Sequence, residues 1–519
     1  MAETTERIGQ SFDEMLDADT HRVRDVLRTA SPLPPGNARV PTAIYTSQAY
    51  HDLEVEKLWS KVWQWACLEE EIPNVGDHFV YDVAHLSFLI VRTDTGLKAF
   101  RNACLHRGRK LKECDGYDAK SIRCAFHGWN WNLDGTLREI PAQWDFPSVD
   151  PAEYALDEAL IDTWHGFVFI NPDLNCTESL TDFLEGLDEH HELLPFEQRA
   201  KIAHVEKIMP VNWKACQEAF MESYHVIATH PTLAPRLGDS NTRYDAYKNF
   251  SRAISPSQVL SPHLYDVTVW EEPEDGAPYR KRVHPFSGAV YERLEEGRVQ
   301  VTARTGKGGI FTEMGVWLEG ELKNADPHLC LWLGGPLLAG MEATPMDAQA
   351  PEGADKRAWA AAARRDQVRK QFGDLIDVDA FSDSEMIDSI YYSVFPNWSP
   401  WGAFNMIMYR FRPHGDNPDE CIFEVMYFAP CPDPDNRPPL PKITRLGVDD
   451  DWTLATELGA TTKIFQQDSL NLPQVQKGLK AQARGEVVFA SENETKIRHF
   501  YNHYFEQLEL GEVPVRLTP

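Results

Sequence analysis

The sequence predicts an α+β protein, in which a small antiparallel β domain precedes a larger domain that packs helices on an antiparallel sheet. Between about residues 72 and 175, short apolar runs such as HFVYDV and GFVFINP alternate with Gly, Asp and Pro turns, which is typical of short strands. After residue 176, helical patterns mix with strand pairs such as FNMIMYRFRP and CIFEVMYFAP. We therefore expect an N-terminal helical extension over 1–44, a β domain over 45–175 and a larger domain over 176–519.

The composition describes an acidic globular protein. A chain of 519 residues can form several cores, and 42% hydrophobic with 25% charged residues is ordinary for a globular chain. The net charge of −29 disfavours nucleic acid and anionic membranes as general partners, because like charges repel. No apolar run approaches the ~18 residues that cross a bilayer. The acidic N-terminus does not resemble a signal or transit peptide, so we expect a cytoplasmic protein.

Helical spacing of apolar residues predicts the remaining elements. Two helices are expected near the N-terminus, one over 7–29 and one over 52–66. The first is followed by the breaker SPLPPG at 31–36, which would act as a hinge. Further helices are expected over 182–194, 213–230, 352–375 and 454–479. These later helices would cover the predicted sheet of the larger domain.

Two paired motifs in the β domain point to an iron–sulfur centre. Cys104-Leu-His106 is followed, after seventeen residues, by Cys124-Ala-Phe-His127. A Rieske [2Fe–2S] cluster needs two thiolates on one iron and two imidazoles on the other, so each motif supplies one ligand of each kind. Structural zinc sites usually combine C-x₂₋₄-C with H-x₃₋₅-H, a combination that the β domain lacks. Unconnected core residues are the other alternative.

A second group of metal-ligand residues lies in the segment NWKACQEAFMESYHVIATHP. On one continuous helix, Glu218, Glu222 and His225 would share a face, because they are spaced by four and three residues. Pro231 disfavours a helical conformation at His230, which can then turn back toward His225. Two histidines and one carboxylate form the facial triad of non-haem Fe(II) oxygenases. A pair of structural or surface histidines is the alternative.

Both groups resemble one known family. RNACLHRGRKL with CAFHGWNWNLDGTL resembles the Rieske domain of ring-hydroxylating oxygenase large (alpha) subunits, and the YHVIATHP segment resembles their iron-binding segment. Respiratory Rieske proteins differ, because they carry cysteines at the positions of Arg109 and Phe126 and a serine at the position of Trp129. That serine hydrogen-bonds the cluster, so its absence implies a lower reduction potential, which suits electron delivery to an iron–oxygen site.

The resemblance implies a ligand set and a fold for the larger domain. It would be a helix-grip, START-like catalytic domain that holds one mononuclear Fe(II), beside the one [2Fe–2S] cluster of the β domain. His225 and His230 match the iron ligands of the family. Asp468, in IFQQDSLNLPQVQKGL, matches the third ligand, with Asp383 and Asp388 as alternatives.

The resemblance also gives Glu222 a catalytic role, since the family has there an acidic residue that bridges the centres of neighbouring subunits. The sequence departs from the family at Ala219, where many members have Asn, and at Pro473, which replaces the usual Glu. Hydrophobic residues of the surrounding segments suit a substrate pocket, with plain core packing as the alternative for each of them. They are Phe220, Met221, Tyr224, Phe404, Met406, Met408 and Phe465.

The implied function is that of a terminal oxygenase component. Electrons would pass through the Rieske cluster to the Fe(II), and O₂ would hydroxylate or dihydroxylate a hydrophobic aromatic or polycyclic molecule, as in aromatic hydrocarbon catabolism. Oxidative O- or N-demethylation is the alternative within the family. No G-x-G-x-x-G follows a strand, so the electron donor should be a separate ferredoxin or NAD(P)H-dependent reductase. Family members form trimers, which implies a homotrimer or an α3β3 assembly.

Two other functions fit parts of the sequence. A Rieske ferredoxin would need only the ~100 residues of a β domain, whereas this chain continues far beyond it. A binding or scaffold protein would have lost the catalytic iron, although His225, His230 and Asp468 are all present.

The β domain also contains a basic segment. Residues 98–138 carry nine basic and four acidic side chains, a local net charge of about +5 in an acidic chain. This predicts a docking surface for an acidic electron donor, or alternatively a charge balance for the reduced cluster and its thiolates.

Overall fold

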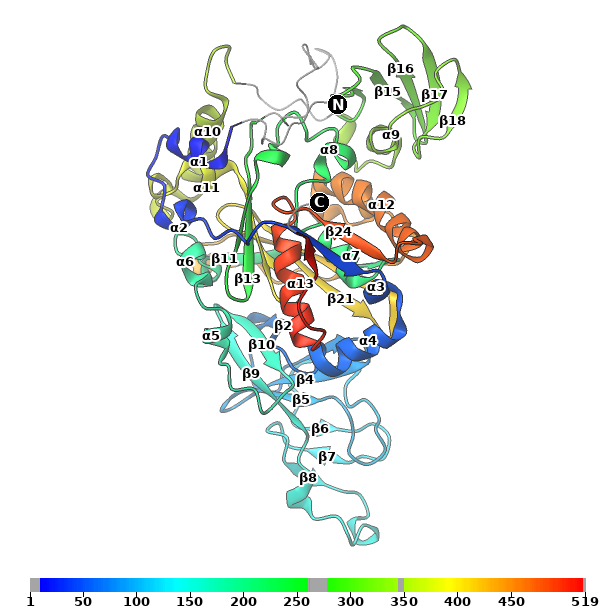
Figure 1. Cartoon of the computed structure of the whole chain (residues 1–519). Helices are drawn as coiled ribbons and strands as arrows, with labels where there is room; N and C mark the ends of the chain where they lie inside the picture. The colour runs from blue at the N-terminus through cyan, green and yellow to red at the C-terminus, as the bar shows by residue number, and fades with distance from the viewer. Residues whose placement is uncertain (1–9, 260, 262–277, 344–349, 517–519) are drawn as a thin grey trace.

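The structure is a computed structural model of the chain, and it describes residues 10–259, 261, 278–343 and 350–516. Within these residues the strands form five sheets, the largest with six and eight strands. Figure 1 shows the six-stranded sheet below the eight-stranded one, and a separate five-stranded sheet at the upper right. The predicted α+β class, with a β domain ahead of a helix-covered sheet, is confirmed.

The β domain is built on a six-stranded antiparallel sheet with the strand order β2-β10-β9-β5-β4-β3. Its strands are β2 Gln64–Leu68, β3 His78–Val83, β4 Leu86–Thr93, β5 Gly96–Arg101, β9 Glu158–Trp164 and β10 Phe167–Asn171. A three-stranded sheet lies at the lower end of the domain in Figure 1. Its strands are β6 Ile122–Arg123, β7 Asn130–Trp131 and β8 Leu137–Glu139.

The larger domain contains the eight-stranded sheet, with the order β12-β13-β19-β20-β21-β22-β11-β23. Its strands are β11 Arg199–Met209, β12 Arg243–Ala246, β13 Phe250–Ser255, β19 Ser389–Val394, β20 Trp398–Pro400, β21 Ile407–His414, β22 Asn417–Pro430 and β23 Thr444–Leu446. All neighbours are antiparallel except β11 and β23. The predicted strand pair is confirmed as β21 and β22, with Tyr409 opposite Val425.

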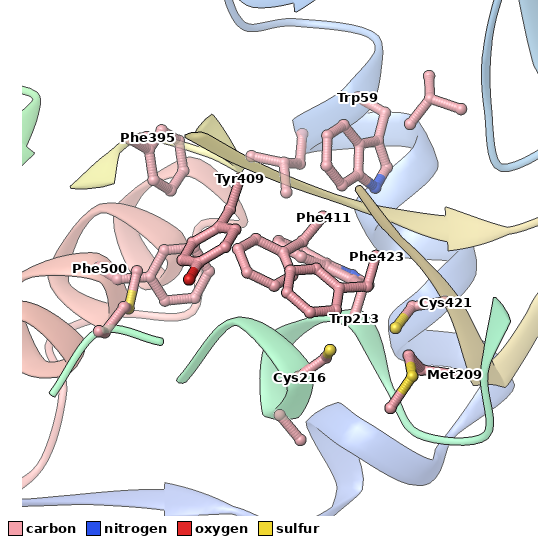
Figure 2. Packing of buried hydrophobic residues seen from close by; sticks show 14 of the residues in the cluster. Trp59, Met209, Trp213, Cys216, Phe395, Tyr409, Phe411, Cys421, Phe423 and Phe500 are labelled. Carbon is pink, nitrogen blue, oxygen red and sulfur yellow. The ribbon is translucent and has the colours of Figure 1, made fainter. Parts of the chain in front are cut away.

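Alternate side chains of this sheet enter two different cores. Tyr409, Phe411 and Phe423 lie in the core that helices cover (Figure 2). Met408 and Met426 lie in the core shared with β2 and β10 of the β domain. The covering helices are α7 Trp213–Glu218, α12 Thr462–Ala481 and α13 Thr495–Gln507. Because successive strand residues point to opposite faces, burial of both faces explains the nearly continuous apolar run CIFEVMYFAP.

The N-terminal segment is not the single hinged helix that the sequence predicts over 7–29. It forms α1 Phe12–Asp17, α2 Asp25–Arg28 and β1 Asn37–Pro41, while residues 1–9 lie outside the described part. Between the two helices, Thr20 donates hydrogen bonds to the Asp383 carboxylate, and the Asp19 carboxylate accepts one from the Asp383 backbone. These tertiary contacts interrupt the helix. β1 then pairs with two late strands, β24 Glu486–Phe489 and β25 Val515–Arg516.

Other predicted helices differ in length. The helix over 352–375 is confirmed as α10 Lys356–Phe372, whereas the helix over 454–479 begins only at Thr462, as α12, after short 3-10 turns. The helix over 52–66 is wrong at its end, because the chain forms α4 Gln48–Glu54 and a π turn Val55–Trp59 and then enters β2. The helix over 182–194 is split into α5 Leu180–Phe183 and α6 Leu187–His191 at Gly186, whose φ of 86° is left-handed. Among the described helices, none is long and apolar enough to cross a membrane.

A five-stranded antiparallel sheet occupies residues whose structure was not predicted from the sequence. Its strands, in sheet order, are β14 Lys281–Val283, β15 Val290–Glu295, β16 Arg298–Thr302, β17 Gly308–Thr312 and β18 Trp317–Gly320. Helix α9, Pro327–Gly334, packs on this sheet through Leu329, Cys330 and Leu333. We refer to residues 278–343 as the α9 module.

Candidate metal centres

The two Cys/His motifs form a pair of loops with the same hydrogen-bond pattern. In the first loop, the N–H of Cys104 donates to the carbonyl of Arg109, and the N–H of Gly108 donates back to Cys104, each at 2.8 Å. In the second loop, Cys124 bonds Trp129 and Gly128 in the same way at 2.8 and 3.1 Å. Gly108 and Gly128 have φ values of 69° and 79°, a left-handed conformation that favours glycine.

The loops bring their four motif residues together. Cys104 and Cys124 are buried. Burial is the main cause that raises the pKa of Cys104, and the neighbouring Cys124 thiol adds to the rise, although backbone hydrogen bonds oppose it. His106 and His127 lie nearer the surface, with ring centroids 4.6 Å apart. The His106 ring stacks on Trp129 at 5.2 Å. Two thiols thus lie inside the domain and two imidazoles at its surface.

The predicted continuous helix over 213–230 is wrong. It is divided into α7, which ends at Glu218, and α8 Val226–Thr229. The predicted common face of Glu218, Glu222 and His225 therefore does not exist. The Glu218 carboxylate instead accepts hydrogen bonds from the hydroxyls of Tyr45, at 2.8 Å, and of Tyr501.

Instead, Asp468 of α12 meets the two histidines. One side-chain atom each of His225, His230 and Asp468 lie within 4.8 Å of one another. Asp468 Oδ1 is 3.0 Å from His230 Nε2 and 3.7 Å from His225 Nε2. The alternative carboxylates lie elsewhere, since Asp383 pairs with an arginine of α10 at 2.6 Å and Asp388 with another at 2.8 Å.

The outer nitrogens of both histidines are also bonded. Glu222 accepts from His225 Nδ1 at 2.6 Å and from its backbone N–H at 2.9 Å. Burial lowers the pKa of His225, but the charge and hydrogen bond of Glu222, with the charge of Asp468, raise it to about 9. His230 Nδ1 lies 2.8 Å from Gln467 Oε1. Gln467 was not among the residues predicted from the sequence, although its position next to Asp468 in the QQD segment was an available signal.

Hydroxyl groups fix the loop between α7 and α8. Ser223 Oγ lies 2.5 Å from Ser255 Oγ and 2.8 Å from the Tyr391 hydroxyl, and the Ser223 N–H donates to the Tyr244 hydroxyl at 2.9 Å. These bonds attach the loop to β12, β13 and β19. They explain why a segment with helical spacing leaves the helix between Glu218 and His225.

The predicted pocket residues divide into separate groups. Phe220 and Phe465 lie with Tyr409 in one aromatic cluster, with ring centroids 5.0 to 6.4 Å apart. Met221 and Met406 belong to or contact the same core. Phe404 packs with the α10 region and Met408 faces the β domain, which agrees with the alternative of core packing for these two residues. Tyr224 is half exposed.

A second group of possible metal ligands lies between the sheets. His204, Glu206 and Glu424 place one ligand atom each within 4.8 Å. Arg410 bonds Glu424 with two nitrogens at 2.6 Å, and Arg412 adds a bond of 2.9 Å. The carboxylate is therefore satisfied by guanidinium groups, and the cluster is an ion-pair network that connects β21 and β22.

Two segments of the chain match known protein families. Residues 62–150 match the Rieske [2Fe-2S] domain, and residues 189–297 and 319–510 match the ring hydroxylating alpha subunit (catalytic domain). The second match alone spans more than half of the chain. The chain belongs to the ring-hydroxylating alpha subunit family. The predicted family is confirmed, as are its cofactor types, a Rieske [2Fe–2S] cluster and a mononuclear iron.

Curated members of the family align with part of this alpha subunit. The anthranilate 1,2-dioxygenase large subunit of Acinetobacter baylyi is 30% identical over 204 residues, which are 38% of this chain and 43% of that protein. The carnitine monooxygenase oxygenase subunit of Escherichia coli K12 is 32% identical over 195 residues, 37% and 52% of the two chains. The chain spans 43% to 63% of the length of the curated relatives that it matches.

Solved structures resemble this alpha subunit over nearly its whole length. A quaternary ammonium Rieske monooxygenase in complex with L-carnitine gives a TM-score of 0.52 at 17% identity, covering 92% of this chain and 99% of that chain. Naphthalene 1,2-dioxygenase with indole bound gives 0.53 at 18% identity, covering 91% and 92%. At these identities the likeness concerns the fold.

Proposed function

We propose that this alpha subunit is the terminal oxygenase component of a Rieske non-haem iron enzyme. The observation that carries the proposal is the convergence of His225, His230 and Asp468 from segments more than 230 residues apart. Two imidazoles and one carboxylate on one side of an ion leave positions for O₂ and substrate. The outer ring nitrogens of both histidines are hydrogen-bonded, as metal-binding imidazoles require.

The four motif residues of the β domain fit a [2Fe–2S] cluster. Two neighbouring thiols, from Cys104 and Cys124, can ligate one iron, and the two neighbouring imidazoles of His106 and His127 can ligate the other. Such a cluster supplies one-electron transfer. Because all its ligand positions belong to the protein, substrate binding is left to the catalytic domain.

Aromatic side chains beside the iron triad support an apolar substrate. Partly buried Phe220 packs against the buried rings of Tyr409 and Phe465. Phe465 lies on α12 three residues before Asp468, and its ring centroid is 6.1 Å from that of Tyr409, which connects the cluster to the triad. Such a wall excludes water and binds rings by stacking. We infer hydroxylation or dihydroxylation of an aromatic or polycyclic compound.

One observation favours oxidative N-demethylation as a second candidate. Trp401 stacks on Tyr391 at 5.1 Å and stands at 90° to Tyr409 at 6.0 Å. Perpendicular aromatic faces attract alkylammonium cations, and relatives of this chain include carnitine and choline monooxygenases. A panel that contains both aromatic hydrocarbons and trimethylammonium compounds separates the two candidates.

The arrangement of the chain supports a multimer with a separate electron donor. In Figure 1, the loops around β6–β8 lie at the lower end, whereas α8 and α12 lie on the far side of the eight-stranded sheet. An electron would more readily reach the iron from the cluster of a neighbouring chain, as the reported inter-subunit electron transfer of a quaternary ammonium Rieske monooxygenase illustrates. We infer a homotrimer or an α3β3 assembly that is reduced by a ferredoxin or reductase.

Metal analysis combined with variants tests the proposal. The chain should contain about three irons, two in the cluster and one in the triad. His225→Ala and Asp468→Ala should abolish ¹⁸O incorporation from ¹⁸O₂ into product and preserve the Rieske absorption spectrum. Two irons per chain, or loss of the Rieske spectrum in either variant, would contradict the assignment of two separate centres.

A further inference from the structure

Three polar side chains of α12, spaced four residues apart, reach from one helix face to the α9 module. Lys463 donates from Nζ to the Pro336 carbonyl at 2.9 Å. Gln467 donates from Nε2 to the His328 carbonyl at 3.0 Å. Asn471 Oδ1 lies 3.2 Å from His328 Nε2. Lys463 and Gln467 are buried, so these bonds are shielded from water.

Two of these side chains also reach the end of α8. Gln467 Oε1 lies 2.8 Å from His230 Nδ1, and Asn471 Nδ2 donates to Thr229 Oγ1 at 3.0 Å. Each therefore connects α9 with one of two consecutive residues, of which His230 is a proposed iron ligand. The hydrogen bonds run without interruption from the α9 module, through α12, to the iron site.

The direction of each bond follows from the donor and acceptor chemistry. A backbone carbonyl can only accept, so the His328 carbonyl requires the NH₂ end of the Gln467 amide. The amide oxygen must then face His230, where it can only accept. His230 consequently carries its proton on Nδ1, which leaves Nε2 as the lone-pair nitrogen that faces Asp468 at 3.0 Å.

We propose that the α9 module positions the iron site. The His328 carbonyl sets the orientation of the Gln467 amide, and Gln467 holds His230 in the tautomer and rotamer that present Nε2 to the metal. Lys463 supports this by fastening the end of α9 to α12. The inference rests on the proposed ligand role of His230. Gln467 is thus a positioning residue, since it acts through His230.

The affinity of the triad for Co(II) tests this in the full-length chain, after removal of the mononuclear iron with the Rieske cluster intact. Gln467→Met has similar length and forms neither bond, and should weaken Co(II) binding by roughly 10- to 100-fold. Gln467→Glu keeps an acceptor for His230 Nδ1 but loses the donor to the His328 carbonyl, so its loss of affinity should lie between the wild type and Gln467→Met. Lys463→Met should weaken binding by about three- to ten-fold, as an indirect effect.

Gln476→Met is the matched control. Gln476 lies on the same helix and is buried, but it bonds the Asn212 backbone and Asp419, away from the triad. Its Co(II) affinity should stay within about two-fold of the wild type. Wild-type affinity in Gln467→Met, or equal losses in the Gln467 and Gln476 variants, would overturn the positioning role. Wild-type Co(II) affinity in Lys463→Met would show that the α9 module has no part in positioning the iron site.

A further variant separates this inference from the proposed function. His230→Ala should abolish Co(II) binding at the triad. Retained binding in His230→Ala would contradict the ligand assignment itself, whereas lost binding in His230→Ala with full binding in Gln467→Met would contradict only the positioning role.

Discussion

Replacement of Glu222 by Gln tests whether this carboxylate assists electron transfer from the Rieske cluster to the mononuclear iron. The Glu222 carboxylate accepts two hydrogen bonds from His225, at 2.6 and 2.9 Å. Burial lowers the pKa of His225, yet the charge and hydrogen bond of Glu222, with the charge of Asp468, raise it to about 9. Glu222→Gln preserves the size and one acceptor oxygen but removes the charge.

The size of the effect follows from the lost charge. Hydrogen bonds to charged groups contribute ~1.5–3 kcal/mol and neutral ones ~0.5–1.5 kcal/mol, so the variant should lose ~1–2 kcal/mol. If Glu222 lies on the route between the cluster and the iron, the loss corresponds to a ~5–30-fold slower electron transfer. Both metals should remain bound when iron is in excess, because the three proposed ligands of the triad are unchanged.

Single-turnover kinetics measure this rate. The Rieske cluster is reduced chemically, O₂ and substrate are added, and reoxidation of the cluster is followed by its absorption. Glu218→Gln is the control, because Glu218 is four residues away and partly buried but bonds Tyr45 and Tyr501 rather than His225. Unchanged reoxidation in Glu222→Gln, or an equal slowing in Glu218→Gln, would refute the reasoning.

Three other predictions follow from the remaining contacts. His106→Ala should abolish the Rieske absorption and EPR spectrum, and a retained spectrum would contradict its ligand role. Burial raises the pKa of Glu424, but the charge of Arg410 above all holds this pKa well below 4.5. The ion pair therefore stabilises the fold above pH ~4.5, and this contribution is lost as the pH falls through the folded-state pKa of Glu424. Arg410→Met should lower the free energy of unfolding by about 3–5 kcal/mol in denaturant titrations at pH 7. Lys110→Glu with Lys112→Glu should raise the KM for the native electron donor but not for the substrate, and turnover should fall with ionic strength; an unaltered donor KM would exclude this docking surface.

The metal-binding motifs could be predicted from the sequence because their geometry is mostly local. One residue separates Cys104 from His106, and two residues separate Cys124 from His127. A tight turn therefore suffices to place thiol and imidazole together in each loop. Asp468 required the family resemblance, since more than 230 residues separate it from His230. Only the fold brings α12 to the end of α8.

The errors arise where tertiary hydrogen bonds override local pattern. The spacing of Glu218, Glu222 and His225 satisfied a helical face, yet Ser223 bonds hydroxyl groups of three strands and takes the loop out of the helix. Helical propensity differs by only tenths of a kcal/mol between most residues, so a few buried hydrogen bonds of ~1 kcal/mol each decide the conformation. Gln467 escaped prediction for a related reason, because its role depends on the His328 carbonyl of a distant helix.

The basic segment of the β domain shows how a charge count changes once the chain folds. Of its nine basic side chains, four form ion pairs: Lys98 with Glu158, Arg109 with Glu113, Lys110 with Asp82, and Lys120 with Asp118. Two of the four acidic partners, Glu158 and Asp82, lie outside the segment, so the surface around the cluster is less positive than the sequence count of about +5 suggests. Among the described residues, the other five basic side chains form no such pair: Arg101, Arg107, Lys112, Arg123 and Arg138. Of these, Arg107 lies over the exposed ring of Phe126 in the second cluster loop. An acidic donor would therefore be attracted mainly by these remaining cations, and the ionic-strength dependence of turnover should be correspondingly shallow.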